Sequence, residues 1–152
     1  MSTRSHSNGK TDLVIHRVLI GSHQVSEYLN SACERAGVSL PLARALQFLA
    51  EAEGPVTPTE LSRELGRSPA ATSELVKRLV NSEQITADID PNDRRSFQLA
   101  LTSRGHSKWQ GVRAELEAAE AFITRRYGKR QLTDLAGAID DLAAALNGAA
   151  SG

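Results

Sequence analysis

The sequence has little of several residue types, and each shortage narrows the classes of protein that it can encode. It has one cysteine, Cys33, so no disulfide bond can form within the chain, which fits a reducing compartment such as the cytoplasm. Aromatic residues make up 4% of the chain, so the core must be mainly aliphatic. No apolar run is long enough to cross a membrane, and residues 1–10 lack the apolar stretch of a signal peptide. We expect a cytoplasmic protein without a membrane partner.

An excess of positive charge is also lacking. The chain has 18 Lys and Arg residues against 18 Asp and Glu residues. A DNA-binding domain is often strongly basic, so this balance is mild evidence against nucleic-acid binding. The position of each cation matters more than the total, because phosphate contacts are made one at a time.

What the sequence has in quantity is helix-forming residues. Its 152 residues suffice for one compact domain that is extended by further helices. Apolar residues at helical spacing, with glycine and proline stops, predict helices at about residues 12–36, 39–53, 57–65, 68–82, 103–128 and 132–146. Two short alternating runs, 85–89 and 97–102, predict strands that are joined by turn residues.

The order of these elements predicts a mainly α fold with a small β-hairpin wing. A short helix, a tight turn, a second helix and a hairpin lie between residues 57 and 102, as in a winged helix-turn-helix. The flanking helices, 11–36 and 103–147, are longer and more apolar than this small region requires, so we expect them to dimerise. We interpret residues 11–147 as one domain, with flexible tails at 1–10 and 148–152.

The two central helices begin with similar signals. Thr57 can cap the first helix, a proline follows, and Glu60 completes a capping box three residues after the cap. Gly66 ends this helix, and Ser68 with the next proline repeats the same start. These signals predict a helix-turn-helix with a tight connection.

The helix that starts at Ser68 is the predicted recognition helix. Its inward face is Thr72, Leu75, Val76 and Leu79. Small and polar residues remain on the outward side, where base edges and phosphates are within reach. The predicted DNA contacts on this helix are Ser68, Pro69, Ala70, Ser73, Lys77 and Arg78. The alternative is a helical hairpin of an all-α domain, whose polar face meets solvent.

The turn between the two strands carries the sequence Asp90-Pro91-Asn92-Asp93-Arg94-Arg95. Two arginines at such a tip suit the minor groove, where negative potential is concentrated. Asp93 is a poor DNA ligand itself, so we expect it to hold one arginine through a bidentate pair. The alternative is a solvated turn, because surface ion pairs are weak.

Several segments of the chain resemble the MarR (multiple-antibiotic-resistance regulator) family. They are Leu61–Gly66, Ser68–Leu79, Asp90–Arg95 and Leu101–Gly105. The aspartate-rich, double-arginine turn followed by Leu-Thr-x-x-Gly is the specific part of the pattern, and the resemblance extends over nearly the whole chain. It implies a bacterial, homodimeric winged-helix regulator of transcription, usually a repressor that a small ligand or oxidation releases from a pseudo-palindromic DNA site.

The resemblance also implies roles for the turn. Arg95 is then the minor-groove arginine held by Asp93, and Arg94 serves the DNA backbone. Two features depart from the family pattern. Glu74 faces the DNA where a basic or neutral residue is expected, so it should read a cytosine amino group or pair with Arg78. Residues 81–84 lack the glycine that the family often has before the first strand.

An effector site is only weakly marked. His16, Arg17 and His23 lie on the first predicted helix at spacings that place them roughly on one side. An arginine can clamp a carboxylate and a histidine can bind a phenol, and the similar family often binds aromatic acids. Together with Trp109 these residues form our candidate site for an aromatic or phenolic acid. The alternative is that they are surface residues or dimer contacts.

Other chemistry is not marked. The sequence has no nucleophile–base arrangement and no phosphate loop, so we expect no enzyme. The histidines and Cys33 lack metal-ligand spacing, and we expect no metal or cofactor. We expect Cys33 to be a buried, inert thiol and not a redox sensor. The leading hypothesis is a DNA-binding regulator, and the alternative is a winged-helix module that binds protein without binding DNA.

Overall fold

The computed structural model describes residues 13–149, which form six helices and a two-stranded antiparallel sheet. This confirms the predicted mainly α fold with a small β-hairpin. In chain order the elements are α1 (Val14–Arg35), α2 (Leu40–Glu51), α3 (Pro58–Leu65), α4 (Pro69–Asn81), β1 (Ile85–Ile89), β2 (Phe97–Leu101), α5 (Ser103–Tyr127) and α6 (Lys129–Ala149).

The last helix is longer at both ends than the sequence indicated. It begins at Lys129 and includes Gly148 and Ala149, which we had assigned to a flexible tail. The Ala- and Leu-rich sequence continues to favour helix past the expected end. The proposed tail at 1–10, the expected start of the first helix at residue 12 and the remainder of the C-terminal tail, 150–152, lie outside the described residues.

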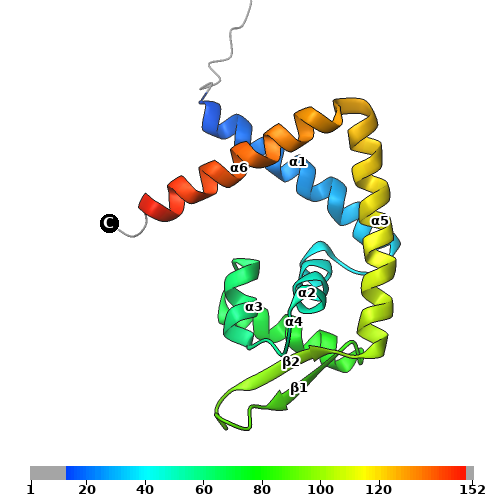
Figure 1. Cartoon of the computed structure of the whole chain (residues 1–152), viewed down its shortest axis with the longest axis vertical. Coiled ribbons are helices and arrows are strands. Elements are labelled where there is room, and N and C mark those ends of the chain that lie inside the picture. The colour runs from blue at the N-terminus through cyan, green and yellow to red at the C-terminus, as the bar shows by residue number, and fades with distance from the viewer. Residues whose placement is uncertain (1–12, 150–152) are drawn as a thin grey trace, which may run out of the picture.

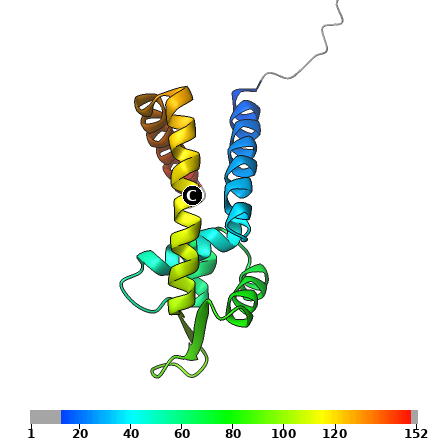
Figure 2. The same cartoon turned by 90° about the vertical axis from the view of Figure 1, so that its right-hand side faces the viewer.

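The molecule has two parts that α5 connects (Figures 1 and 2). We call residues 36–112 the lobe; it contains α2, α3, α4, the hairpin and the start of α5. We call residues 13–35 with 113–149 the arm; it contains α1, the rest of α5, and α6, which turns back at the far end of α5. None of the helices within residues 13–149 combines the length and apolar character needed to span a membrane.

The predicted helix starts of the helix-turn-helix are present. Glu60 N–H donates to Thr57 Oγ1 (3.2 Å), and Thr57 N–H donates to the Glu60 carboxylate (2.8 Å), which completes the capping box. Gly66 ends α3 in the left-handed conformation, with φ 60°, which glycine adopts without steric cost. Ser62 Oγ then donates to Arg67 O (2.7 Å), which fixes the turn before α4.

The start of α2 is capped by a side chain of another helix. Ser39 occupies the N-cap position, but its side chain makes no capping hydrogen bond. Instead, Leu40 N–H donates to Asn30 Oδ1 of α1 (2.9 Å). The cap therefore comes from another helix, and it ties the arm to the lobe.

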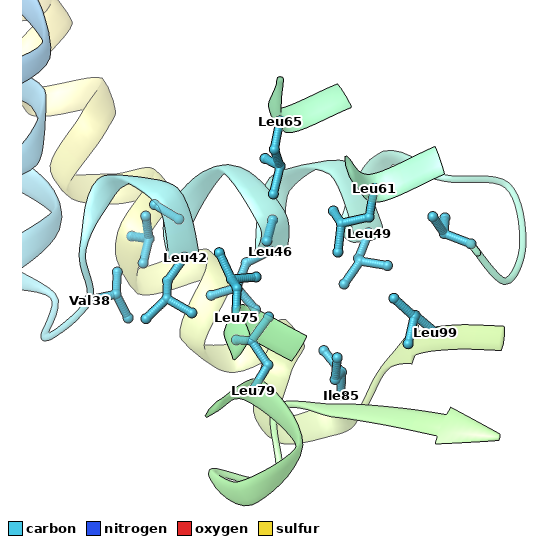
Figure 3. Close-up of a cluster of buried hydrophobic side chains, with 14 of the residues drawn as sticks. Val38, Leu42, Leu46, Leu49, Leu61, Leu65, Leu75, Leu79, Ile85 and Leu99 are labelled. Carbon is cyan, nitrogen blue, oxygen red and sulfur yellow. The ribbon is translucent and has the colours of Figure 1, made fainter. Parts of the chain in front are cut away.

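The core of the lobe surrounds α2 (Figure 3). Leucines of α2 point toward leucines of α3, α4 and β2 in this view. Leu46, Leu61, Leu79 and Leu99, one from each of these elements, are fully buried. Their burial fixes the orientation of α4 and of the wing relative to the rest of the lobe, since removal of apolar surface from water stabilises this arrangement.

The hairpin is attached to the lobe at its base and projects at its tip. Ile85 pairs with Leu101 and Ile89 pairs with Phe97. Leu99 also exchanges backbone hydrogen bonds with Val56 (2.9 and 2.7 Å), which adds one bridging residue to the sheet. Ile85 is buried, whereas Ile89 and Phe97 are exposed. The face of the hairpin that is buried at the base is therefore exposed near the tip.

The connection from α4 to β1 forms without the glycine that the family pattern suggested. Glu83 adopts the left-handed conformation, with φ 57°, which costs a residue with a Cβ roughly 1–2 kcal/mol. Thr102 Oγ1 donates to Glu83 O (2.6 Å) and accepts from Gly105 N–H (3.0 Å). A Cβ at Gly105 would collide with the backbone carbonyl of Gln84. The Leu-Thr-x-x-Gly motif therefore joins α5 to this connection.

Candidate nucleic-acid interface

The orientation of α4 matches the prediction for a recognition helix. Thr72, Leu75 and Leu79 are buried against the lobe. On the opposite side Ala70, Ser73, Glu74, Lys77 and Arg78 are exposed. Small residues occupy the first turns, so the backbone can approach a base pair closely. This geometry suits insertion into the major groove.

The N-terminus of α4 has one amide free for a phosphate. Ser68 Oγ accepts from Ala71 N–H (3.2 Å), as an N-cap should. Pro69 has no N–H group, and within the described residues the Ala70 N–H has no partner. An unpaired amide at the positive end of a helix attracts an anion.

Glu74 has a different partner from the one we expected. Its carboxylate accepts from Lys77 Nζ at 2.8 Å, and not from Arg78. Both residues are within reach of a helical carboxylate, at three and four positions along the chain. The sequence does not decide between the two partners, because the choice depends only on the side-chain rotamer of Glu74.

The wing tip corrects our expectation for Asp93. Its carboxylate accepts from the backbone N–H of Arg95 (3.0 Å), and no guanidinium among residues 13–149 pairs with it. Asp90 similarly accepts from Asn92 N–H (2.8 Å), and Asp90 N–H donates to Ser96 O (3.0 Å). The carboxylates of Asp90 and Asp93 therefore stabilise the turn by accepting backbone hydrogen bonds. The guanidinium groups of Arg94 and Arg95 remain available to contact DNA.

A hollow of about 800 Å³ lies between α3, α4 and the hairpin. Its lining includes Arg63, Arg67 and Lys77 but no carboxylate. Arg63 and Arg67 are not among the DNA contacts that the sequence predicts. They come from α3, so only the tertiary arrangement places them beside α4. A small signal was present, since they are four residues apart and thus on one face of a helix.

The candidate effector residues are not brought together within one chain. His16, Arg17 and His23 are exposed on α1. Trp109 is half-buried and lines a second hollow of about 380 Å³, whose walls come from α2 and α5: Gln47, Glu51, Trp109, Arg113, Leu116, Glu117 and Glu120. Helix α1 contributes no residue to it. The spacing that put three side chains on one side of α1 gave no information on which helix that side faces.

Cys33 lies in the core beside α2 and α5 and is fully buried. Burial raises the pKa of its thiol above the ordinary value of 9.0, and the nearby Arg35 only partly opposes this. A thiol with a raised pKa is protonated at neutral pH and is a poor nucleophile. This supports the prediction of an inert cysteine.

One segment of the chain is similar in sequence to a known family. Residues 36–96 match the sequence model of the MarR family. A search of curated protein sequences found no match. The matched segment begins just before α2 and ends in the wing turn, so it covers the helix-turn-helix and the aspartate–arginine tip.

Solved structures share the fold of nearly the whole chain. One is a transcriptional repressor, CouR, bound to a 23-mer DNA duplex, with TM-score 0.81 and 18% identity, over 86% of this chain and 92% of that one. A MarR-family transcriptional regulator from Rhodococcus sp. RHA1 has TM-score 0.79 and 18% identity, over 90% and 96%. RV1404 from Mycobacterium tuberculosis has TM-score 0.68 and 25% identity, over 90% and 93%. Residues 36–96 are thus similar in sequence to the MarR family, and the chain shares its fold with solved structures of transcriptional regulators, one of which is described as a MarR-family protein.

Proposed function

We propose that this chain is a cytoplasmic, homodimeric repressor that binds a pseudo-palindromic DNA site and is released by a small ligand. In this proposal α4 enters the major groove and the wing tip enters the minor groove. Ser68, Pro69, Ala70, Ser73, Lys77 and Arg78 contact the DNA from α4. Arg94 and Arg95 contact it from the wing, where Asp93 holds the turn.

The observation that carries the proposal is the charge distribution around α4. The chain as a whole has no net charge. Beside α4, however, Arg63, Arg67 and Lys77 line one hollow; Lys77 pairs with Glu74, while Arg63 and Arg67 form no ion pair among the described residues. Cations gathered on one face attract phosphates regardless of the total charge. The similar structure of CouR is described as bound to a DNA duplex, which agrees with this use of the fold.

Exposed apolar side chains of the arm support the proposal of a dimer. Leu19 of α1 is 66% exposed and Leu146 of α6 is 60% exposed, and none of the described side chains of α6 is buried. Isolated helices gain little stability from propensity alone, so a helix of this kind needs a packing partner. A second copy of the arm offers a surface of the same apolar character.

DNA binding can be tested without knowledge of the natural site. The full chain is used to select duplexes from a random library, and the affinity for the enriched duplex is then measured at several salt concentrations. We expect Lys77→Ala and Arg95→Ala each to weaken binding by about tenfold or more. The control Arg113→Ala removes an exposed arginine of α5 that pairs only with Glu117, and it should bind like the wild type.

Two outcomes would contradict the proposal. Enrichment of no sequence by the wild-type chain would contradict a sequence-specific regulator and favour the alternative, a module that binds protein without binding DNA. Unchanged DNA binding by the combined Lys77→Ala, Arg95→Ala variant would show that α4 and the wing do not make the proposed contacts.

Release by a ligand is a separate part of the proposal. His16 and Arg17 are exposed, and within one chain α1 does not line the hollow that contains Trp109, so in this proposal α1 of a second copy brings them to it. Thermal-shift measurements with benzoate and 4-hydroxybenzoate test this arrangement. Stabilisation that disappears in both Arg17→Ala and Trp109→Ala supports it, and stabilisation that survives in Arg17→Ala contradicts the arginine clamp.

A further inference from the structure

We infer that Glu74 is a specificity-determining residue that reads a cytosine in the major groove, with Lys77 neutralising its charge. The inference rests on the proposed DNA binding and adds a base preference to it. A carboxylate accepts a hydrogen bond from the cytosine N4 amino group, and no other base offers an equivalent single donor without a competing acceptor beside it.

The position of Glu74 on α4 is the first step. Thr72, Leu75 and Leu79 define the buried face of the helix. Glu74 lies two residues from Thr72 and five from Leu79, so at 100° per residue it is close to the side opposite that face. Its side chain is 72% exposed, and it shares this side with Ala70 and Lys77.

The reach of the carboxylate is the second step. Side chains of a helix lean toward its N-terminus, so Glu74 projects over the turn that holds Ala70 and Ala71. Both are alanines, and Ala70 is exposed. Only methyl groups therefore occupy the two positions one turn N-terminal to Glu74, and neither is large enough to cover its carboxylate.

The charge of Glu74 is the third step. It is the one carboxylate of α4, on a face where phosphates would repel it. Lys77 Nζ lies 2.8 Å from its Oε1, which offsets that repulsion. The pair thus brings an acceptor to the groove with little net charge.

Stability of the fold does not account for the pair. The side chains of Lys77 and Glu74 are 64% and 72% exposed, and ion pairs of this kind contribute little to folding. An alanine or lysine at position 74 would serve the helix equally well and would bind DNA more strongly without regard to sequence. The carboxylate is explained by discrimination among sequences, which often relies on a repulsive element.

The test is in-vitro selection from a random duplex library with four full-length proteins: wild type, Glu74→Ala, Glu74→Gln and Lys77→Ala. We expect the wild type to enrich cytosine at one position of each half-site. Glu74→Ala should lose that preference by roughly tenfold while gaining affinity for duplexes that lack the cytosine. Glu74→Gln should prefer adenine there, because an amide binds the adenine edge in a bidentate manner.

Lys77→Ala separates the charge from the base contact. It should weaken binding to all duplexes and reduce the slope of log affinity against log salt by about one, with the cytosine preference retained. The matched control is Glu117→Ala, which removes a carboxylate of similar exposure that pairs with Arg113 at 2.7 Å on α5. It should leave affinity and preference unchanged.

The outcomes distinguish this inference from the function on which it rests. Wild-type and Glu74→Ala proteins that enrich the same sequences, with equal preference at every position, would overturn the role of Glu74 and leave the proposed function standing. A wild-type protein that enriches no sequence would overturn both. Loss of preference at one position in Glu74→Ala alone supports the inference.

Discussion

In the lobe Leu42, Leu46 and Leu49 of α2 are buried among other elements, whereas in the arm several large apolar side chains of α1 and α6 are exposed: Ile15, Leu19, Ile20, Leu135, Ile139 and Leu146. The arm is almost wholly helical and the lobe also contains the hairpin, yet the part with more helix has fewer buried apolar side chains, so the contrast in burial comes from packing. The lobe satisfies its apolar surface within one chain. The arm does not, and this is the physical reason to propose that the arms of two copies pair.

The largest expected effect comes from removal of a core leucine. Leu46→Ala should lower the free energy of unfolding by about 2–5 kcal/mol, because Leu46 is fully buried and the change leaves a cavity. Leu19→Ala removes the same atoms from an exposed position and should cost less than about 0.5 kcal/mol in the monomer. Urea unfolding at low protein concentration measures both. Equal losses would show that the lobe and the arm do not differ as described.

A smaller loss is expected at the point where α5 joins the α4–β1 connection. Gly105→Ala places a methyl group against the Gln84 carbonyl and 2.9 Å from Leu101 Cδ2, which should cost about 1–3 kcal/mol. Gly111→Ala is the control within the same helix, since no atom lies within 4 Å of its added Cβ. It should stabilise the protein by about 0.5–1 kcal/mol. Thermal unfolding of both variants gives the comparison, and a stable Gly105→Ala protein would refute the close approach.

The arm is tested by placing a charge on its apolar surface. Ile139→Glu should weaken dimerisation by at least about tenfold, because a carboxylate would be buried between the copies. The fold of the lobe should remain, as judged by its unfolding midpoint. Sedimentation velocity reports the mass, with Gln131→Glu on the same helix as the control. A dimer of unchanged strength would place the interface elsewhere.

Two substitutions of Asp93 distinguish between its two possible roles, which are to stabilise the wing turn and to hold an arginine side chain. Asp93→Ala removes the acceptor for Arg95 N–H and should weaken DNA binding about two- to tenfold, the range for one hydrogen bond. Asp93→Asn keeps an oxygen acceptor and should bind at least as well as the wild type, because it also removes a negative charge. Measured affinities for the selected duplex decide the matter. A strong loss in Asp93→Asn would favour a clamp that forms on DNA.

The smallest effect is expected at the α3 capping box. Hydrogen bonds from Thr57, first from its backbone and then from its side chain, lower the pKa of Glu60 below 4.5. A lowered folded-state pKa stabilises the protein above the unfolded value, and this stability is lost as pH falls through the folded value. Glu60→Gln should therefore unfold slightly more easily at neutral pH, by less than about 1 kcal/mol, and equally at low pH. A difference that grows on acidification would contradict the shift.

Local features of the fold were predictable from the sequence because they depend on neighbours along the chain. The Thr57–Glu60 capping box, the stop at Gly66 and the buried face of α4 are of this kind. The cap that Asn30 provides for α2 was not predictable, since it depends on where α1 packs.

The candidate site likewise has features that were predictable from the sequence and features that were not. The outward face of α4 followed from helical spacing. The contribution of Arg63 and Arg67 did not, because two helices must first be placed side by side. The partner of Asp93 was mistaken for a different reason: a carboxylate in a turn can accept from an arginine side chain or from the amide of the same residue, and local backbone geometry decides.

The central claim is that two lobes read one DNA site because two arms pair. Sedimentation velocity on the selected duplex, with one half-site and with two half-sites about one helical turn apart, tests it most directly. The account predicts two chains on the duplex with two half-sites and much weaker binding to the single half-site. One chain per duplex, bound with equal affinity to both, would contradict it.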